Sequence, residues 1–366
     1  ISCQSNDQSI CGKIVQAFLD AGSILSSTLL LKSSIFVNIS VYDFCGDDPT
    51  CSGENFYNPG YAQPTLLYLL KDNDGVERLY PQSLVKQFNF SNNPEYKHPD
   101  IYGEFNLALD YWFKDDPSPI KYNQYDFLGI ILHELCHGLG FLTSWSIWSN
   151  DESSQYITPM LITEEDYEYI WEDNYDPSVK ISWRGFREYI FDKYLVFTNT
   201  GDYVSNQTTL LNEFFNNNGD IYGNYDDFHQ KFISSPQYNI AVTMLNISIQ
   251  SQTLGLVNWN LTSHHGKPFN ISDLFVVDTT SNPFDPYNSI NHVDYNMYTN
   301  TSDFLMRYQL PPGETLSADI RLAGKTPNSY LTNAIELAPV SSGISLVPSY
   351  LIIQHVIGLL LINAYL

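Results

Sequence analysis

The stretch His133-Glu134-Leu135-Cys136-His137 constrains the fold of this chain more than any other feature. An α-helix advances about 100° per residue, so side chains four positions apart lie within about 40° of each other. A helix over this stretch therefore presents both imidazoles on one outward stripe, at a separation that suits two nitrogen ligands of one zinc ion. The carboxylate of Glu134 falls beside the stripe, where it could take a proton from a water on the metal.

The residues around this motif predict the helix itself. Asn123 is a suitable N-cap, Asp126 follows three residues later, and the helix should extend to about Gly138. The side opposite the histidines is apolar and predicts a buried back, formed by Leu128, Ile131, Leu132, Leu135 and Leu139. Cys136 lies about 80° from the histidine stripe and is expected to be a small buried helix residue rather than a ligand.

The charge of the chain excludes two classes of partner. The 366 residues include 41 acidic and 17 basic side chains, for a formal net charge of −24. Such a surface repels nucleic acid and anionic membrane surfaces, so we expect neither to bind it directly.

Sequons and cysteines indicate an exported protein whose signal peptide, if it had one, precedes Ile1 and has been removed. Seven Asn-x-Ser/Thr sequons favour glycosylation, at Asn38, Asn89, Asn206, Asn246, Asn260, Asn270 and Asn300. Outside the cell, four cysteines are expected to form two disulfides, with three connectivities open: Cys3, Cys11, Cys45 and Cys51.

The C-terminal residues predict attachment to a membrane. Residues 350–366 contain no Asp, Glu, Lys or Arg and are rich in Leu and Ile. No basic residue follows, so a membrane span would lack its cytoplasmic anchor. The small residues Ser341, Ser342 and Gly343 come before the tail, as in an attachment signal for a glycosylphosphatidylinositol (GPI) lipid anchor. We expect a lipid-anchored surface protein, with a true span or a buried terminal helix as alternatives.

The run from His133 to Phe141 resembles the start of HExxHxxGxxH, the motif of the metzincin zinc peptidases. Gly140 matches the glycine at which the metzincin chain turns away from its helix. The third histidine of the compact motif would stand at position 143, where this chain has Thr143. A subgroup similar to leishmanolysin and to some secreted bacterial peptidases instead has a long insertion before that histidine, and the methionine of the Met-turn follows within about a dozen residues.

Two downstream residues match that subgroup. The resemblance implies that His292 is the third ligand and that Met306, fourteen residues later, is the Met-turn residue beneath the metal. It covers the start of the chain, residues 102–141 and residues 288–312, and says little about 145–285. It also implies that a strand within 102–113 is the sheet edge to which a peptide substrate adds.

Other third ligands remain open on the residues alone. They are His264 or His265, His229, and a carboxylate from Glu164 or Glu165, as in thermolysin-like enzymes. Gly140 argues against the last arrangement, which does not require it. His98, His229 and His355 are otherwise interpreted as structural or surface residues.

Periodicity elsewhere predicts a mixture of helices and strands. Helical spacing predicts a first amphipathic helix from Ile10, Ile14, Phe18, Ala21 and Leu25. Alternation over Ile35–Val41 predicts a half-buried strand, and the apolar runs on either side of Asp72-Asn73-Asp74-Gly75 predict a hairpin. The stretch Trp183–Tyr194 is expected to be helical.

These observations together predict an α+β, metzincin-like catalytic domain with a mixed sheet and an active-site helix. Residues 1–144 would form the N-terminal catalytic subdomain and 145–285 a large insertion. Residues 286–340 would form a loop-rich C-terminal subdomain with the third ligand and the Met-turn, and 341–366 the hydrophobic anchor signal.

The predicted function is that of a zinc metalloendopeptidase that hydrolyses extracellular proteins, with Glu134 as general base. One alternative is a non-catalytic surface binding or adhesion protein on a peptidase-like scaffold. Another is a zinc hydrolase that acts on a non-peptide substrate.

Overall fold

A computed structural model describes residues 1–316 apart from several short segments. The residues left out are 30, 47–57, 89, 91–92, 148–154, 164–167, 171–180, 220, 258–268, 270, 300, 302 and 317–366. Several sequence predictions therefore lie outside the described residues: the anchor signal at 341–366, Cys51, Glu164, Glu165, His264, His265 and His355. Within the described ranges, no helix is both long enough and apolar enough to cross a bilayer.

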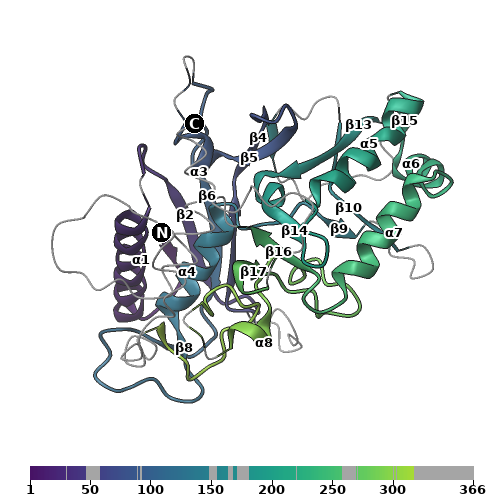
Figure 1. Ribbon diagram of the computed structural model, residues 1–366. Coiled ribbons are helices and arrows are strands. Elements are labelled where there is room, and N and C mark those ends of the chain that lie inside the picture. The colour runs from purple at the N-terminus through teal and green to yellow at the C-terminus, as the bar shows by residue number, and fades with distance from the viewer. Residues whose placement is uncertain are drawn as a thin grey trace.

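A four-stranded mixed sheet, covered on one face by two helices, forms the N-terminal half (Figure 1). Its strand order is β1 (Ser2–Cys3), β2 (Val37–Tyr42), β6 (Ile101–Asn106) and β3 (Gly60–Pro64). The pairs β1–β2 and β2–β6 are parallel, and β3 runs antiparallel to β6. The covering helices are α1 (Gln8–Thr28) and α4 (Phe127–Gly138). The predicted α+β class is confirmed.

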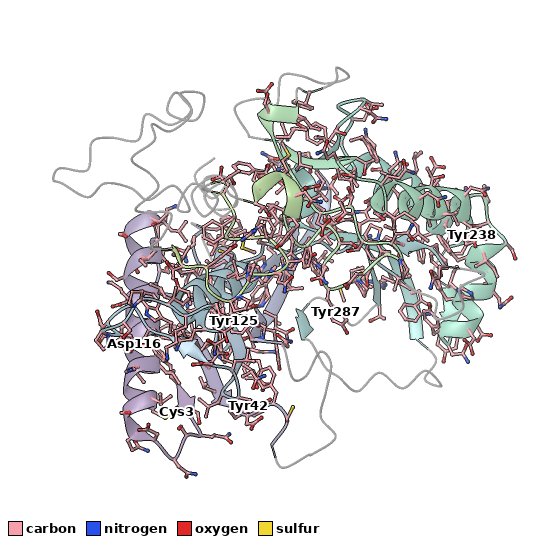
Figure 2. All side chains as sticks on the ribbon, turned by 90° about the horizontal axis from the view of Figure 1, so that it is seen from below. Cys3, Tyr42, Asp116, Tyr125, Tyr238 and Tyr287 are labelled. Atoms are coloured by element: carbon pink, nitrogen blue, oxygen red, sulfur yellow. A yellow bond between two sulfur atoms is a disulfide. The ribbon has the colours of Figure 1, made fainter. Side chains whose placement is uncertain are left out.

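Helix α1 forms as its apolar spacing predicts. The carboxylate of Asp7 caps it by accepting a hydrogen bond from the Ser9 N–H at 2.8 Å. Four of the five predicted core positions are buried, at Ile14, Phe18, Ala21 and Leu25. The Phe18 ring packs edge-on against Phe105 of β6 and Phe127 of α4, so one aromatic cluster joins both helices to the sheet. On the outer side, Asp116 lies along α1 (Figure 2) and accepts a hydrogen bond from Lys13.

The edge of this sheet is a different strand from the one predicted. Strand β6 within 102–113 is flanked by β2 on one side and β3 on the other, so it is an inner strand. Strand β3 occupies the edge next to α4 instead. Its sequence, Gly-Tyr-Ala-Gln-Pro, has little of the β-branched and aromatic alternation that marks a strand, so only pairing with β6 reveals it.

A second sheet contains strands from both sides of residue 145. Its order is β11 (Met160–Thr163), β13 (Ile181–Tyr189), β5 (Glu77–Pro81), β4 (Leu66–Lys71) and β12 (Glu168–Ile170), with β15 (Ile221–Gly223) also paired to β13. The predicted hairpin is confirmed as the antiparallel pair β4–β5. Because β13 pairs with β5, main-chain hydrogen bonds join residues 145–285 to the first part of the chain.

The expected helix over Trp183–Tyr194 is wrong. Residues up to Tyr189 belong to β13, and only Ile190–Tyr194 turn helically, as the 3-10 helix η2. Strand β13 is irregular, because its register with β11 skips a residue between Gly185 and Trp183. Such a bulge displaces the alternation of side chains, and the apolar positions then fall at the spacing of a helix.

Three further helices pack near β13 on the other half of the molecule (Figure 1). They are α5 (Ser205–Asn218), α6 (Tyr225–Ile233) and α7 (Gln237–Ser248). The remaining elements are short: α3 (Gln82–Val85), β7 (Tyr111–Trp112), β8 (Tyr125–Asp126), β9 (Ser146–Ile147), β10 (Ile157–Thr158), β14 (Leu195–Phe197), β16 (Leu254–Val257), η4 (Ile271–Asp273), β17 (Leu274–Val276) and α8 (Tyr295–Tyr298). Figure 2 shows Tyr287, ahead of α8, between the half with Cys3 and Tyr42 and the half with Tyr238.

Close packing of α4 on β6 yields a stability prediction. A Cβ atom at Gly138 would lie 2.4 Å from Cγ2 of Ile101, so Gly138→Ala should destabilise the protein by about 1–3 kcal/mol through overpacking. Gly12 in α1 has nothing within 4 Å of such an atom, so Gly12→Ala should instead be neutral or stabilising by up to about 1 kcal/mol. Denaturant unfolding of both variants checks this, and equal stabilities would contradict it.

Candidate metal centre

Helix α4, which contains His133 and His137, begins at a different cap from the one predicted. Asp126, not Asn123, is the N-cap, and its carboxylate accepts from the N–H groups of Leu128 and Gly129 at 3.1 and 3.3 Å. Residues Tyr125 and Asp126 are held extended in β8 by pairing with β7, so the helix cannot start earlier. The Asn123 amide donates to Asp110 instead.

The histidine stripe of α4 is buried and does not face solvent as expected. His133 and His137 are 6% and 7% exposed, and His292 from the C-terminal segment is 6% exposed. The downstream segment covers the stripe, since the Leu305 carbonyl lies 2.6 Å from Nδ1 of His133.

Three imidazole nitrogens converge at this point. The Nε2 atoms of His133, His137 and His292 form a triangle with all three sides 3.2 Å long. Nitrogen ligands at the tetrahedral positions of a zinc ion, about 2.0–2.1 Å from the metal, lie about 3.3–3.4 Å apart. Among the described residues, these three form the only cluster of His, Cys, Asp or Glu side chains whose ligand atoms are close enough to hold a metal ion. The residues present therefore fit zinc in both donor type and spacing.

The hydrogen bonds of the Nδ1 atoms determine that the Nε2 atoms are the ones available to bind a metal ion. Each Nδ1 donates to a backbone carbonyl: His133 to Leu305, His137 to Phe141 and His292 to Asn288, at 2.6, 2.8 and 3.2 Å. A carbonyl can only accept, so Nδ1 carries the proton and each Nε2 presents a lone pair toward the other two. Three lone pairs at this distance repel one another unless a cation lies among them, and carbonyl partners of this kind orient metal-binding histidines.

Burial keeps these rings in the form that binds metal. It lowers the pKa of His133 to about 3 and that of His137 to about 4, and it holds the pKa of His292 well below its ordinary value. All three rings are therefore neutral at physiological pH, as metal binding requires.

Glu134 follows His133 in the sequence but is not part of the three-histidine cluster. It is 7% exposed, and burial raises the pKa of its carboxyl group to about 8. The backbone N–H of Ala62 donates to this carboxylate, so Glu134 faces the edge strand β3. Residue types along the chain do not predict this contact, because every residue except proline carries the same N–H group.

Gly140 ends the helix as the resemblance implies. Its φ of 114° is one that glycine adopts readily and other residues rarely do. The turn brings the Phe141 carbonyl back to His137 and leads the chain to Thr143, which is buried.

Met306 is fully buried next to the segment that contains His292. Its carbonyl accepts from the N–H of Val293 at 2.8 Å, and Val293 and Arg307 form a parallel bridge. The segments that contain His292 and Met306 therefore run side by side, with Leu305 against His133.

The remaining candidates have other environments. Nδ1 of His229 lies 3.1 Å from the Tyr156 hydroxyl and its ring stacks on Tyr156 and Tyr225, so it is not near the three-histidine cluster. Cys136 is free and buried, as expected. Cys3 and Cys11 form a disulfide, and Cys45 is also disulfide-bonded.

Comparison with known proteins gives a family for this chain. A sequence profile of the SPBPB7E8-like family matches residues 1–328. The chain belongs to this family. A protein of Schizosaccharomyces pombe that is described as uncharacterised is 25% identical over 328 residues, which cover 87% of this chain. The matched region spans 55% of that relative's length. No solved structure matches the chain.

Proposed function

We propose that this chain is a zinc-dependent endopeptidase with a metzincin-like catalytic domain. The observation that carries the proposal is the triangle of Nε2 atoms with 3.2 Å sides, whose lone pairs point at one another, with Glu134 next to His133 on the same helix. Three protein ligands that leave a fourth position free are typical of catalytic rather than structural zinc. Gly140 and Met306 also stand where the metzincin resemblance requires a turn and a buried methionine.

Each part of the reaction has a candidate group. Zinc would supply Lewis acidity toward the scissile carbonyl and make a water molecule acidic near neutral pH. A zinc ion nearby would lower the pKa of Glu134 again and favour its carboxylate form. In that form Glu134 would accept the proton of the attacking water and then donate it to the leaving amine. A purely structural zinc site has no use for such a carboxylate.

The edge strand β3 offers a place for the substrate backbone. The Pro59 carbonyl accepts from Asn106 and the Thr65 N–H donates to Asp100, both at 3.0 Å. Because backbone groups alternate in direction along an antiparallel strand, those of Gly60 and Ala62 point away from β6. The Gly60 N–H there donates to Asn58 Oδ1 at 3.0 Å and the Ala62 N–H to Glu134, so a substrate would pair with the two carbonyls. An extended peptide could pair there as an additional strand, with its scissile bond next to Glu134.

We also place the protein outside the cell, attached to the surface by a lipid anchor signalled within 341–366. The three sequon asparagines among the described residues, Asn38, Asn206 and Asn246, are all exposed. The Cys3–Cys11 disulfide fits an oxidising compartment. The partners would then be extracellular protein or peptide substrates.

Hydrolysis of casein or gelatin with and without a chelator tests the proposal. The purified protein should cleave both, lose activity when the metal is removed, and regain it when zinc is added back. Zinc binding without cleavage would contradict the peptidase and favour the non-catalytic surface protein. Cleavage that persists without metal would contradict the metal mechanism.

A further inference from the structure

The side chain before the third histidine connects two loops. Oδ1 of Asn291 accepts from the backbone N–H of Thr143 at 2.8 Å, and its Nδ2 donates to the Pro286 carbonyl at 3.0 Å. Asn291 is 8% exposed, so water competes little for these bonds. The loop after α4 is thus tied directly to the segment that delivers His292.

The loop after α4 is itself held from the 145–285 region. The carboxylate of Asp192, which is fully buried in η2, accepts from the Thr143 hydroxyl at 2.6 Å and from the Ser144 hydroxyl and N–H at 2.6 and 2.8 Å. A fourth bond comes from the Tyr189 N–H at 3.1 Å. Charge-assisted bonds of this kind are among the stronger hydrogen bonds in proteins, so the loop has a fixed position relative to β13 and η2.

The backbone before His292 is in a conformation that needs such support. Ile290 has a φ of 66°, in the left-handed region that β-branched residues rarely adopt. Its side chain is fully buried and its N–H donates to the Asp278 carbonyl at 2.8 Å. A strained conformation persists only where the surrounding contacts enforce it, and it is common at functional sites.

We propose that Asn291 is a positioning residue which, together with Thr143 and the buried Asp192, holds His292 opposite His133 and His137. The 145–285 insertion then has a specific role: it supplies Asp192, which fixes the loop to which Asn291 binds. This inference rests on the proposed metal site.

In this chain hydrogen bonds, rather than a short stretch of backbone, connect the third histidine to the helix that contains the other two. A compact motif would place its third ligand at position 143 itself, six residues after His137. Here the backbone N–H of Thr143 donates to Asn291, which precedes the proposed ligand His292 in the sequence. His292 itself is 155 residues beyond His137. Asn291 does not belong to the three-histidine cluster, so its effect on a metal ion passes through His292.

Zinc affinity of Asn291→Ala, measured by competition with a chromophoric chelator, tests this role. Loss of a direct outer partner of a metal ligand typically weakens metal binding about 10–100-fold. Asn291 does not bind the His292 ring itself, so we expect a measurable loss that lies at or below the lower end of that range. The absorption spectrum of the cobalt-substituted protein should change as well, because the geometry of His292 changes. Asn291→Asp keeps the acceptor for Thr143 but loses the donor to Pro286, so it should lie between wild type and Asn291→Ala.

Asn212→Ala is a matched control. The Asn212 side chain makes the same two kinds of bond, accepting from the Phe186 N–H at 2.8 Å and donating to its carbonyl at 3.0 Å, but between α5 and β13. Its loss should lower the melting temperature and leave zinc affinity and the cobalt spectrum unchanged. Equal zinc affinities for Asn291→Ala and wild type would overturn the inference.

Hydrogen exchange in the metal-free proteins separates this inference from the proposed function. Asn291→Ala should speed exchange over residues 286–294, whereas Asn212→Ala should not. Unchanged exchange there would contradict the positioning role even if zinc binds and peptides are cleaved. A wild-type protein that binds no divalent ion would contradict the proposed function, and with it the role of His292, whatever the exchange rates.

Discussion

Replacing Glu134 with glutamine should lower kcat/KM for peptide hydrolysis by about 10²–10⁴-fold while the protein still binds one zinc ion. Glutamine has nearly the same shape, so the buried pocket and the bond from the Ala62 N–H should survive. It cannot accept the proton of an attacking water, so the loss should appear in kcat rather than in metal content. Steady-state kinetics on a fluorogenic peptide and metal analysis of the same samples measure both.

The control for this variant is Glu213→Gln. Glu213 is an exposed carboxylate on α5 with no place in the proposed reaction, and its replacement is the same chemical change from glutamate to glutamine. Its kcat/KM should match wild type. Wild-type activity in the Glu134→Gln protein would show that Glu134 does not transfer the proton and has no part in the mechanism.

Replacing His292 with alanine should weaken zinc binding by more than about 100-fold, beyond the range expected for outer partners, and abolish hydrolysis with it. The two remaining histidines, one turn apart on α4, would leave zinc with only two protein ligands. His292→Cys should restore part of the affinity, because a thiolate is also a good zinc ligand at tetrahedral sites. Isothermal titration with zinc measures the series.

His229→Ala is the matched histidine control. His229 binds and stacks on Tyr156, so its loss should affect stability but not zinc affinity. Wild-type zinc affinity in His292→Ala would show that another side chain completes the site. The candidates would then be those left open by sequence and outside the described residues, such as His264 or Glu164.

Local sequence signals predicted local structure well where one physical cause dominated. The apolar spacing of α1 and the polar turn between β4 and β5 each depend on residues a few positions apart, and both elements formed as predicted. Where tertiary contacts changed the local rule, prediction was wrong. The bulge in β13 places the apolar residues of a strand at the spacing expected for a helix. Strand β3 has no strand-like sequence pattern and is recognised only by its pairing with β6.

The sequence by itself determined the pair of histidines on α4, because helical periodicity fixes the relation between residues one turn apart. It also named His292 and Met306, but only through a family resemblance, and it left rival ligands open. The tertiary structure decided which histidine meets the pair, since that depends on the hydrogen bonds that join Val293 to Met306 and Asn291 to Thr143. Such contacts link residues more than 140 positions apart or use backbone groups that every residue shares, so residue types along the chain do not encode them in any local pattern.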